Sequence, residues 1–439
     1  MSDISIIGGG PAGLAVAYYA SINEKEFEIF EANTIIGGNC ITIKKNNFYF
    51  DSGAHRLHDV DSETTDLFKK ILKKDLKKID ISSQIYFKNQ FIDFPISPIN
   101  LVKFLGIKRS TLEGVKILFN NLKTKKISNF QTLVEKKYGK YIANLFLINY
   151  SEKLWGTPAN KLSITISGKR LKGLNLLTLI IELIFGKQKK TRHLDGSFYY
   201  PKFGIGTLFD NLALQLDYKN INLNSTITKV YHENFKVKEI EINNKNIKKI
   251  KQLVTTIPID IFIKQLSPSP PKKIINLISQ IKYRNVILIA FFINKKTINS
   301  NGSMYFPSKK FPFTRIYEPR NRSNHMSPKN KTSLIVELPC FKEDKYWNYN
   351  ENEISLKIEK QLIALNLFDK NEVIQKEVYK IKNAYPVLEN DIEKKLKPIT
   401  DYLSKFTNLK SIGRNGLFAY SHIHDQFISA RKIFKEIKN

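Results

Sequence analysis

Short apolar runs and a helical repeat alternate along the first thirty residues. Ser5–Ile7 and Phe27–Phe30 are short and apolar, as strands buried on both faces of a sheet are. Between them, Leu14–Ala20 carries apolar residues at helical spacing. A glycine-rich stretch, Gly8–Gly13, separates the first strand from this helix. The pattern predicts a strand, a tight turn, a helix and a second parallel strand, which is the beginning of an α/β fold.

The predicted turn has the glycine spacing of a dinucleotide-binding loop. Gly8 permits the turn, Gly10 lets a pyrophosphate approach the backbone, and Gly13 lets the helix pack closely on the strand. The start of the helix then offers N–H donors to the phosphates. Glu31 follows the second strand, about 20 residues past the glycines, where a carboxylate accepts hydrogen bonds from ribose hydroxyls. The residues expected to contact the adenosine and diphosphate are Gly8, Gly10, Pro11, Ala12, Gly13, Glu31 and Ala32.

A second glycine pair follows the acidic residue in Gly37-Gly38-Asn39-Cys40. This segment resembles the extended fingerprint of the FAD-binding glutathione-reductase-2 superfamily, which includes amine oxidases, protoporphyrinogen oxidases, phytoene desaturases and UDP-galactopyranose mutases. The Gly-Gly-Asn-Cys form looks most like the mutases. The resemblance implies FAD, with Gly37, Gly38 and Asn39 along its diphosphate and ribityl chain.

The next segment, Phe48–Leu57, resembles the strand and turn that approach the flavin ring in that superfamily. The resemblance places Gly53, Ala54 and His55 beside the ring. His55 has two interpretations of equal weight: a catalytic or flavin-tuning group, or a hydrogen-bonded loop histidine.

Further motifs carry the resemblance through nearly the whole chain. They are Tyr150–Thr157, Phe198–Leu208, Ile227–Val230, Leu253–Pro258 and Ile412–Tyr420, in the family's order. By this resemblance, the remaining FAD contacts come from Val230, Thr256, Gly413, Arg414 and Phe418.

The predicted architecture is a Rossmann-like FAD-binding domain with a discontinuous α+β substrate domain. Residues 1–62, 194–260 and 397–439 are expected to form the FAD domain. Residues 63–193, largely helical, and 261–396 are expected to form the substrate domain. The clearest elements of the second insertion are the strands Val286–Ile293 and Ser333–Leu338 and the helix Ile354–Leu365.

Charge changes the picture only in part. The 439 residues include 71 Lys and Arg against 40 Asp and Glu, a formal net charge of +31. Three explanations are open: surface lysine that follows from overall composition, an anionic substrate or membrane, and nucleic acid. Basic runs such as Lys248–Lys251 are short and no nucleic-acid motif accompanies them, so no nucleic-acid partner is expected. Two cysteines, Cys40 and Cys340, exclude a disulfide scaffold and a multi-cysteine zinc site, and no metal is expected.

No apolar segment reaches the ~18–20 residues of a membrane span, and the N-terminus does not resemble a secretory signal, so we expect a cytoplasmic protein. Leu174–Phe185 is the longest apolar stretch, and Lys187, Lys189, Lys190 and Arg192 follow it. It is expected to be a buried helix. The alternative is a peripheral contact of residues 174–192 with the inner face of an anionic membrane. No oligomeric state is assigned.

The Tyr150–Thr157 segment resembles a ligand-binding turn of the superfamily. Tyr150 and Trp155 are expected to line the substrate pocket, with Lys153 pairing with an anion. A pocket wall is favoured over plain core packing because Lys153 and Gly156 have no evident role in a core.

Two chemistries fit this resemblance, and the first is slightly favoured. A mutase-like enzyme would use flavin N5 at the anomeric carbon of a nucleotide-activated sugar or polysaccharide precursor, and it needs cations for the diphosphate. The cations available for this are Arg170, Arg284, Arg315, Arg320 and Arg322. Arg315 is preferred because its segment looks like the substrate-facing strand of the superfamily, and Arg284 is next because it directly precedes a predicted strand. The alternative is an oxidase or dehydrogenase of the porphyrinogen or amine type, which needs an apolar slot. A flavin fold without turnover is disfavoured, because all five fingerprint glycines are intact.

The expected catalytic residues are His55, Arg284, Arg315 and Tyr317, and the expected substrate contacts are Tyr150, Trp155, Arg170, Tyr305, Arg315 and Tyr385.

Overall fold

The computed structural model describes residues 2–94, 102, 105–122, 126–167 and 197–438. Its first layer is a five-stranded parallel sheet in the order β20-β13-β1-β2-β9. These strands are β1 (Ile4–Ile7), β2 (Phe27–Phe30), β9 (Ile221–Asn222), β13 (Gln252–Thr255) and β20 (Leu409–Ser411). The predicted α/β class is confirmed, and the carboxyl ends of all five strands meet at one edge.

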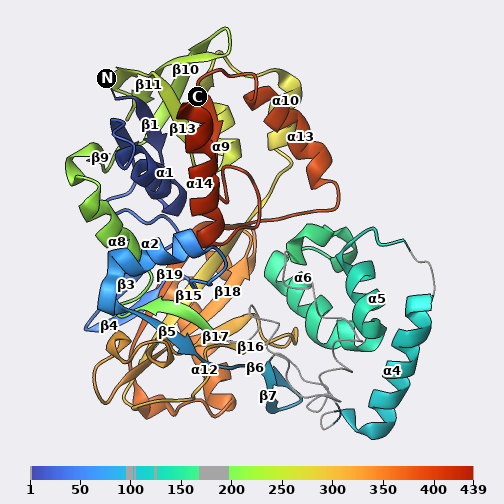
Figure 1. Cartoon of the computed structure of the whole chain (residues 1–439). Coiled ribbons are helices and arrows are strands. Elements are labelled where there is room, and N and C mark those ends of the chain that lie inside the picture. Colours follow the sequence, from blue (N-terminus) through green and yellow to red (C-terminus); the bar gives the residue numbers. More distant parts are fainter. Residues whose placement is uncertain (1, 95–101, 103–104, 123–125, 168–196, 439) are drawn as a thin grey trace.

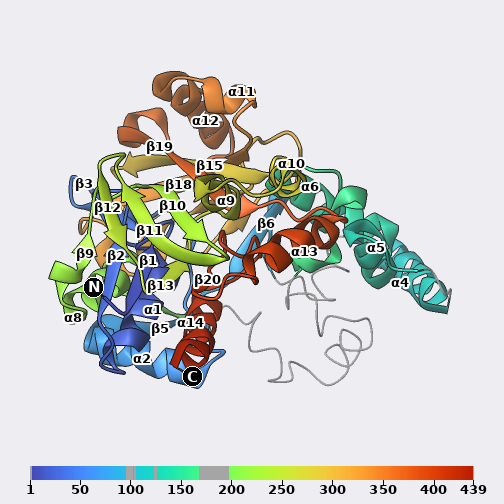
Figure 2. The same ribbon diagram turned by 90° about the horizontal axis from the view of Figure 1, so that it is seen from above.

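Two apolar cores enclose this sheet, because consecutive residues of each strand point to opposite faces. Ile6 packs with the helices on one face, whereas Ile7 packs toward a second, four-stranded sheet. The helices are α1 (Pro11–Ser21), α2 (Ser62–Leu72), α8 (Gly206–Gln215) and α14 (Ile423–Lys438). The four-stranded sheet holds β10 (Ile227–Glu233), β11 (Lys236–Ile242), β12 (Asn246–Lys249) and β14 (Leu266–Ser267). Figure 2 shows the parallel sheet between these two layers.

A seven-stranded sheet forms the lower part of the molecule in Figure 1. Its order is β19-β15-β18-β17-β16-β6-β7, and β15 and β18 at its centre are almost entirely buried. The strands are β6 (Ser83–Phe87), β7 (Gln90–Phe94), β15 (Tyr283–Ile293), β16 (Met304–Tyr305), β17 (Arg315–Tyr317), β18 (Thr332–Cys340) and β19 (Val373–Pro386). Helices α11 (Lys345–Asn348) and α12 (Glu351–Ala364) accompany this sheet. A hairpin of β3 (Thr42–Lys45) and β4 (Phe48–Asp51) packs on it through Phe48 and Phe50.

A separate helical group lies beside the β6–β7 end of this sheet (Figure 1). It consists of α4 (Ile107–Leu122), α5 (Phe130–Ile142), the π-helical turn η2 (Ala143–Ile148) and α6 (Asn149–Trp155). The expectation that residues 63–193 are largely helical is therefore incomplete. This insertion also holds β6 and β7, and its strand β5 (Leu76–Asp80) pairs with β8 (Ser197–Pro201).

The second insertion begins with helices that pack near the FAD-domain layers. α9 (Ile259–Gln265) and α10 (Lys272–Ile278) share one core with β10, β11 and α13 (Ile392–Leu403). The structure therefore groups residues 259–278 with the four-stranded sheet rather than with the seven-stranded one. The predicted boundary at residue 260 is too early by this grouping, because the first helices after β13 bury their apolar faces against the strands that precede them.

Arg170 and the basic apolar stretch 174–192 lie outside the described residues. Among the helices that the structure does describe, none is long and apolar enough to cross a membrane.

Candidate active site

The first glycine turn closes the carboxyl end of β1 against Glu31. The Gly9 N–H donates to Glu31 Oε2 at 2.7 Å, and Asn33 donates its backbone N–H to Oε1 at 2.9 Å. Gly8 has a φ of +102°, a conformation that side chains rarely adopt. A Cβ on Gly13 would overlap the Gly8 carbonyl oxygen. These contacts give the glycines the steric roles that the sequence predicts.

A second glycine loop packs directly against the first. A Cβ on Gly38 would lie 3.1 Å from the Gly10 Cα, whereas a Cβ on Gly10 would meet nothing closer than the Gly38 Cα at 3.7 Å. Gly413, at φ +88°, approaches from the end of β20, where a Cβ would lie 3.1 Å from the Ala12 Cβ. Backbone from three separated segments therefore converges at the start of α1, where a helix N-terminus attracts phosphate.

The other predicted FAD contacts differ in their hydrogen-bond partners and in their burial. Thr256 donates its hydroxyl to the Ile7 carbonyl at 3.0 Å and fixes the turn after β13. Asn39 donates to the Asn383 carbonyl at 3.4 Å. Val230 and Phe418 are fully buried, whereas Ala32 is exposed beside Glu31.

Two buried polar atoms remain unsatisfied near the second glycine loop. Within the described part of the chain, His55 Nε2 and Asn415 Oδ1 have no hydrogen-bond partner. His55 is held by its neighbours, since its Nδ1 lies 3.9 Å from Cys40 Sγ and its carbonyl accepts from Arg322 Nη1 at 3.3 Å. Asn415 donates its amide to the Asn383 carbonyl at 3.0 Å. Buried groups of this kind normally have a partner, so these two atoms fit a polar ligand that completes the site.

His55 is held neutral by its surroundings. Burial of the ring lowers its pKa from 6.5 to about 3, and the charges of Arg414, Arg315 and Arg322 act in the same direction. A neutral imidazole adds no positive charge to the site at neutral pH.

This shift predicts a pH dependence of stability. As pH falls from 6.5 toward 3, the unfolded chain protonates His55 while the folded chain does not. The free energy of unfolding should therefore fall by up to about 1.4 kcal/mol per pH unit from this residue. Urea unfolding curves across this range should show a smaller slope for His55→Gln than for the wild type. His325→Gln, at an exposed histidine, serves as the control. Equal slopes for His55→Gln and the wild type would refute the assignment.

Arg315 lies at the centre of a polar cluster. Its Nε donates to Glu337 Oε2 at 2.8 Å and its Nη2 donates to the same oxygen. Glu337 Oε1 accepts from the Ala54 N–H at 2.8 Å, which ties this pair to the loop that carries His55. Tyr150, Tyr305 and Tyr385 are all within electrostatic reach of the guanidinium. We call Arg315, Glu337 and these three tyrosines the Arg315 cluster.

The Arg315 cluster draws on five elements of the fold. Arg315 and Glu337 are paired residues of β17 and β18, and the tyrosines come from α6, β16 and β19. Tyr150 and Tyr305 meet edge to face with ring centroids 5.7 Å apart. Burial raises the pKa of Tyr385 to about 12, so its hydroxyl stays protonated as a donor. All three tyrosines are half-buried. The cluster therefore presents a cation and phenol hydroxyls at the boundary between the helical group and the large sheet.

Trp155 forms an aromatic wall next to the Arg315 cluster. Its ring lies edge-on to Tyr385 and Tyr420, with centroids 6.0 and 5.7 Å away. Arg414 lies above both tyrosine rings, at 5.7 and 5.5 Å from their centroids, and donates to the Ser421 carbonyl. Trp155 is only 3% exposed, so its ring also belongs to the core.

Lys153 was expected to pair with an anion and Gly156 to have no role in a core, and the structure gives both a structural role. Lys153 Nζ donates to the carbonyls of Ser308 and Phe311 at 2.9 and 3.0 Å and to that of Phe306. These bonds fasten α6 to the loop after β16 rather than to an anion. Gly156 ends α6 with φ +66°, and a Cβ there would overlap Arg284.

Arg284 was expected to be catalytic, whereas the structure shows its donors engaged in structural contacts. It donates to the carbonyls of Lys153 and Leu154 at 3.2 and 3.3 Å, to that of Pro339 at 3.0 Å, and to Asp344 Oδ2 at 3.0 Å. Its donors are therefore bound to the end of α6 and to β18. It positions Trp155 rather than a substrate.

Removing this clamp should destabilise the protein. Arg284→Met leaves one buried and two partly buried carbonyls, together with Asp344, without their donor, so we expect the free energy of unfolding to fall by about 2–4 kcal/mol. Urea denaturation measures it. Lys282→Met, at an exposed residue just before the same strand, should change stability by no more than about 0.5 kcal/mol. Similar small effects for both variants would contradict the clamp.

Tyr317, Arg320 and Arg322 make their direct contacts outside the Arg315 cluster, although Tyr317 is within electrostatic reach of Glu337 and Arg315. The Tyr317 hydroxyl donates to the Asp51 carbonyl at 2.8 Å, and its ring lies 4.5 Å below the Arg322 guanidinium. Tyr317 is therefore a support of the Asp51–His55 loop rather than the catalytic group expected. Arg320 and Arg322 line a different cavity, described below.

Sequence reasoning missed Glu337 and Asn415. Glu337 interrupts the apolar run Ser333–Leu338, and a lone acid in such a run is a signal of a buried partner. Asn415 adjoins Arg414, and nothing in its local pattern distinguishes it from a turn residue.

The comparisons with known proteins agree with this geometry. Residues 11–410 match the model of the family described as flavin-containing amine oxidoreductases. The chain belongs to this family. The 4,4'-diapophytoene desaturase (4,4'-diaponeurosporene-forming) of Staphylococcus aureus strain bovine RF122 is 24% identical over 390 residues, covering 76% of this chain and 75% of that protein.

Solved structures show the same fold. A reduced UDP-galactopyranose mutase superposes with a TM-score of 0.85 at 18% identity, covering 100% of this chain and 94% of that one. Wild-type putrescine oxidase bound to putrescine gives 0.65 at 14% identity, covering 99% and 98%.

The chain is thus an FAD-dependent enzyme of the amine oxidoreductase superfamily. The glycine cradle, formed by Gly8–Gly13, Gly37, Gly38 and Gly413, and the two unsatisfied atoms, His55 Nε2 and Asn415 Oδ1, are consistent with this cofactor.

Proposed function

We propose that this flavoenzyme performs mutase-like chemistry on a nucleotide-activated sugar or polysaccharide precursor. The observation that carries the proposal is the Arg315 cluster: a cation fixed by Glu337 and surrounded by half-buried tyrosines. A diphosphate needs such a cation and hydroxyl donors, whereas an apolar substrate does not.

In this proposal the residues of the Arg315 cluster, Trp155 and His55 each have a definite role. Arg315 pairs with the diphosphate and stabilises the negative charge that grows on it when the anomeric C–O bond breaks. Tyr150, Tyr305 and Tyr385 donate hydrogen bonds to phosphate or sugar oxygens. Trp155 and Tyr385 close the side of the site, and neutral His55 adds no competing cation. Bound reduced FAD supplies a nucleophilic ring nitrogen for the anomeric carbon. The diphosphate later returns to that carbon, so no net oxidation occurs.

Positional isotope exchange tests this proposal directly. The photoreduced holoenzyme is incubated without oxygen with UDP-sugars carrying 18O in the bond between sugar and phosphate. Cleavage and return of the diphosphate scramble the label to non-bridging positions, which NMR detects. We expect scrambling with reduced enzyme and little with oxidised enzyme. No scrambling with any nucleotide sugar would refute the proposal.

A second candidate is an oxidase or dehydrogenase, which the similarity to a phytoene desaturase favours. In that case a hydride leaves a substrate C–H bond for the flavin, and the electrons pass on to oxygen or a quinone. The polar Arg315 cluster is a poor match for an apolar polyene. Oxygen consumption or flavin bleaching by the oxidised enzyme with amines, porphyrinogens or polyenes, without isotope exchange, would favour this alternative.

A further inference from the structure

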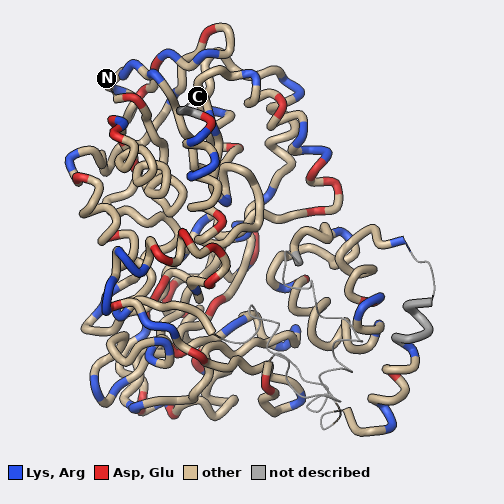
Figure 3. The backbone as a smooth tube through the Cα atoms, viewed as in Figure 1, with Lys and Arg blue, Asp and Glu red and all other residues tan. Residues whose placement is uncertain are grey.

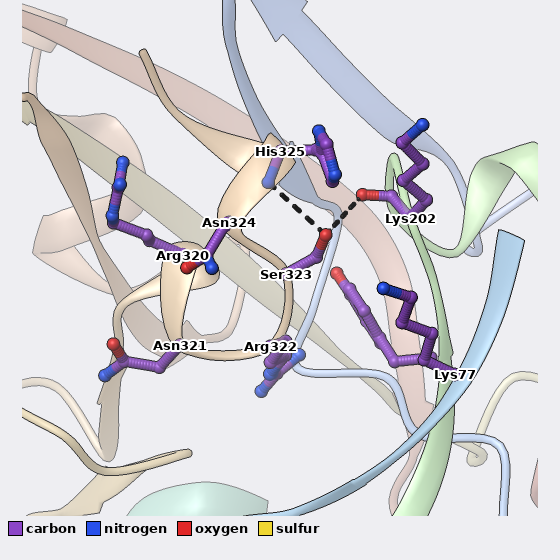
Figure 4. Close-up of a pocket in the computed structure, with 9 residues that line it drawn as sticks. Lys77, Lys202, Arg320, Asn321, Arg322, Ser323, Asn324 and His325 are labelled. Atoms are coloured by element: carbon purple, nitrogen blue, oxygen red, sulfur yellow. Dashed lines mark hydrogen bonds between the residues drawn. The ribbon is translucent and has the colours of Figure 1, made fainter. Parts of the chain in front are cut away.

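A basic cavity adjoins the Asp51–His55 loop, since its lining residue Arg322 donates to the His55 carbonyl. It has a volume of about 220 Å³. It is lined by residues of β5, β8 and the loop that follows β17 (Figure 4), namely Lys77, Tyr200, Lys202, Arg320, Asn321, Arg322, Ser323, Asn324 and His325. None of these residues belongs to the Arg315 cluster or to the glycine cradle.

The lining has one sign of charge. Two lysines and two arginines line the cavity together with a histidine, and no Asp or Glu is among these residues. Asp75 and Asp51 approach the lining from outside: Asp75 Oδ1 lies 3.9 Å from Lys202 Nζ, at the edge of salt-bridge distance, and Asp51 accepts the Tyr200 hydroxyl at 2.5 Å. Lysine and arginine are spread over the whole molecule (Figure 3), so charge alone does not mark a site. What marks this one is its concave shape together with the arrangement of Arg322.

Arg322 is a buried cation whose donors are only partly used. The residue is 3% exposed, and its Nη1 and Nη2 donate to the His55 and Gly302 carbonyls over long distances of 3.3 and 3.4 Å. Its Nε has no hydrogen-bond partner among the described residues. The buried Asp51 carboxyl group is within electrostatic reach of Arg322, but its hydrogen bonds come from Tyr200, Thr42 and the Ile205 N–H, so the Arg322 Nε stays open for an anionic ligand. The stacking of Arg322 on Tyr317 fixes its plane in the cavity wall.

The loop beside Arg322 is held in place by hydrogen bonds to neutral backbone groups, which do not neutralise its positive charge. Ser323 Oγ donates to the Lys202 carbonyl at 2.6 Å and accepts from the His325 N–H (Figure 4). Arg320 donates to the carbonyls of Pro328 and Lys331, so uncharged groups satisfy it. A preorganised loop of this kind binds an anion without a large ordering cost.

We propose that the basic cavity binds a phosphate group, either as free phosphate or as the phosphate end of a larger molecule. Lys77 and Lys202 supply mobile charge at the mouth, and Arg322 supplies a fixed donor in the wall. The site is distinct from the proposed sugar-nucleotide site and does not depend on which reaction the flavin performs. Because Arg322 also donates to the His55 carbonyl, the cavity is in contact with the loop that carries His55.

Calorimetric titration of the FAD-loaded chain tests the site. The chain is titrated with sodium phosphate or glycerol 3-phosphate in the absence of any nucleotide, and the variants described below separate binding in this cavity from binding at the Arg315 cluster. Sodium chloride at matched ionic strength controls for general screening. We expect saturable binding of at least one phosphate ligand and none of chloride. A preference for glycerol 3-phosphate indicates that the ligand is a larger molecule, and equal binding indicates free phosphate.

A matched pair of variants locates the binding. Lys77→Gln/Lys202→Gln should bind phosphate about tenfold or more weakly, because two charge-assisted contacts are lost. Lys245→Gln/Lys249→Gln removes the same charge from exposed positions outside the cavity and should bind as the wild type does. Flavin absorbance and circular dichroism confirm that both variants fold. Absence of saturable phosphate binding in the wild type, or equal weakening in both variants, would overturn the proposal.

Discussion

A Gly10→Ala variant is expected to fold normally and to bind FAD about 10–100-fold more weakly. Gly10 has an ordinary φ of −78°, and an added Cβ would meet only the Gly38 Cα, at 3.7 Å. The protein itself therefore accepts alanine. The methyl group would instead enter the space in which a pyrophosphate approaches the turn, which costs about 1–3 kcal/mol of steric strain.

Two further glycines separate this effect from simple misfolding. Gly13→Ala places its Cβ on the Gly8 carbonyl oxygen, so it should lower the stability of the FAD-free protein as well. Gly114→Ala, on α4 with open space around it, should be neutral or stabilise the helix by up to about 1 kcal/mol. FAD affinity is measured by fluorescence titration of apoprotein, and stability by urea unfolding. If Gly10→Ala destabilised the apoprotein as much as Gly13→Ala, the cofactor-specific role of Gly10 would be wrong.

The glycine turns and the first strands could be predicted because their causes are local. A turn needs glycine at fixed offsets, and a buried strand needs a short apolar run, so the sequence alone indicates both. The same reasoning placed Glu31 correctly at the end of β2, where it accepts from the Gly9 N–H.

The roles of the charged residues could not be predicted in the same way, because they depend on contacts across the sheet and between domains. Arg315 meets Glu337 through the register of β17 and β18, which joins residues 22 positions apart. Lys153 and Arg284 are residue types that often bind ligands, yet both donate their hydrogen bonds to backbone carbonyls of α6 or its neighbours. Which carbonyls a helix end presents is a property of packing rather than of a local motif.

Arg315 also joins two parts of the candidate active site. Through Glu337 it is tied to the Ala54 N–H and hence to the loop of His55, while its guanidinium faces the tyrosines of α6, β16 and β19. A single ion pair thus connects the proposed diphosphate site with the loop expected at the flavin ring. Substitutions of the two partners should consequently have opposite consequences for ligand binding.

Arg315→Lys is expected to lower kcat/KM for a nucleotide sugar on the order of 10²-fold. Lysine keeps the charge but loses the planar fork, so it cannot hold Glu337 through Nε and Nη2 and also pair with a diphosphate. The loss of about 3 kcal/mol is that of one or two charge-assisted hydrogen bonds.

Glu337→Gln is the matched variant: its amide oxygen can still accept from Ala54, while the opposing charge is removed from Arg315. It should therefore bind UDP as tightly as the wild type or more tightly, even if turnover falls because Arg315 is less well oriented. UDP affinity from flavin fluorescence and steady-state kinetics distinguish the two. Arg315→Lys that retained full UDP affinity, or Glu337→Gln that lost it to the same extent, would show that Arg315 serves Glu337 and the fold rather than an anionic substrate.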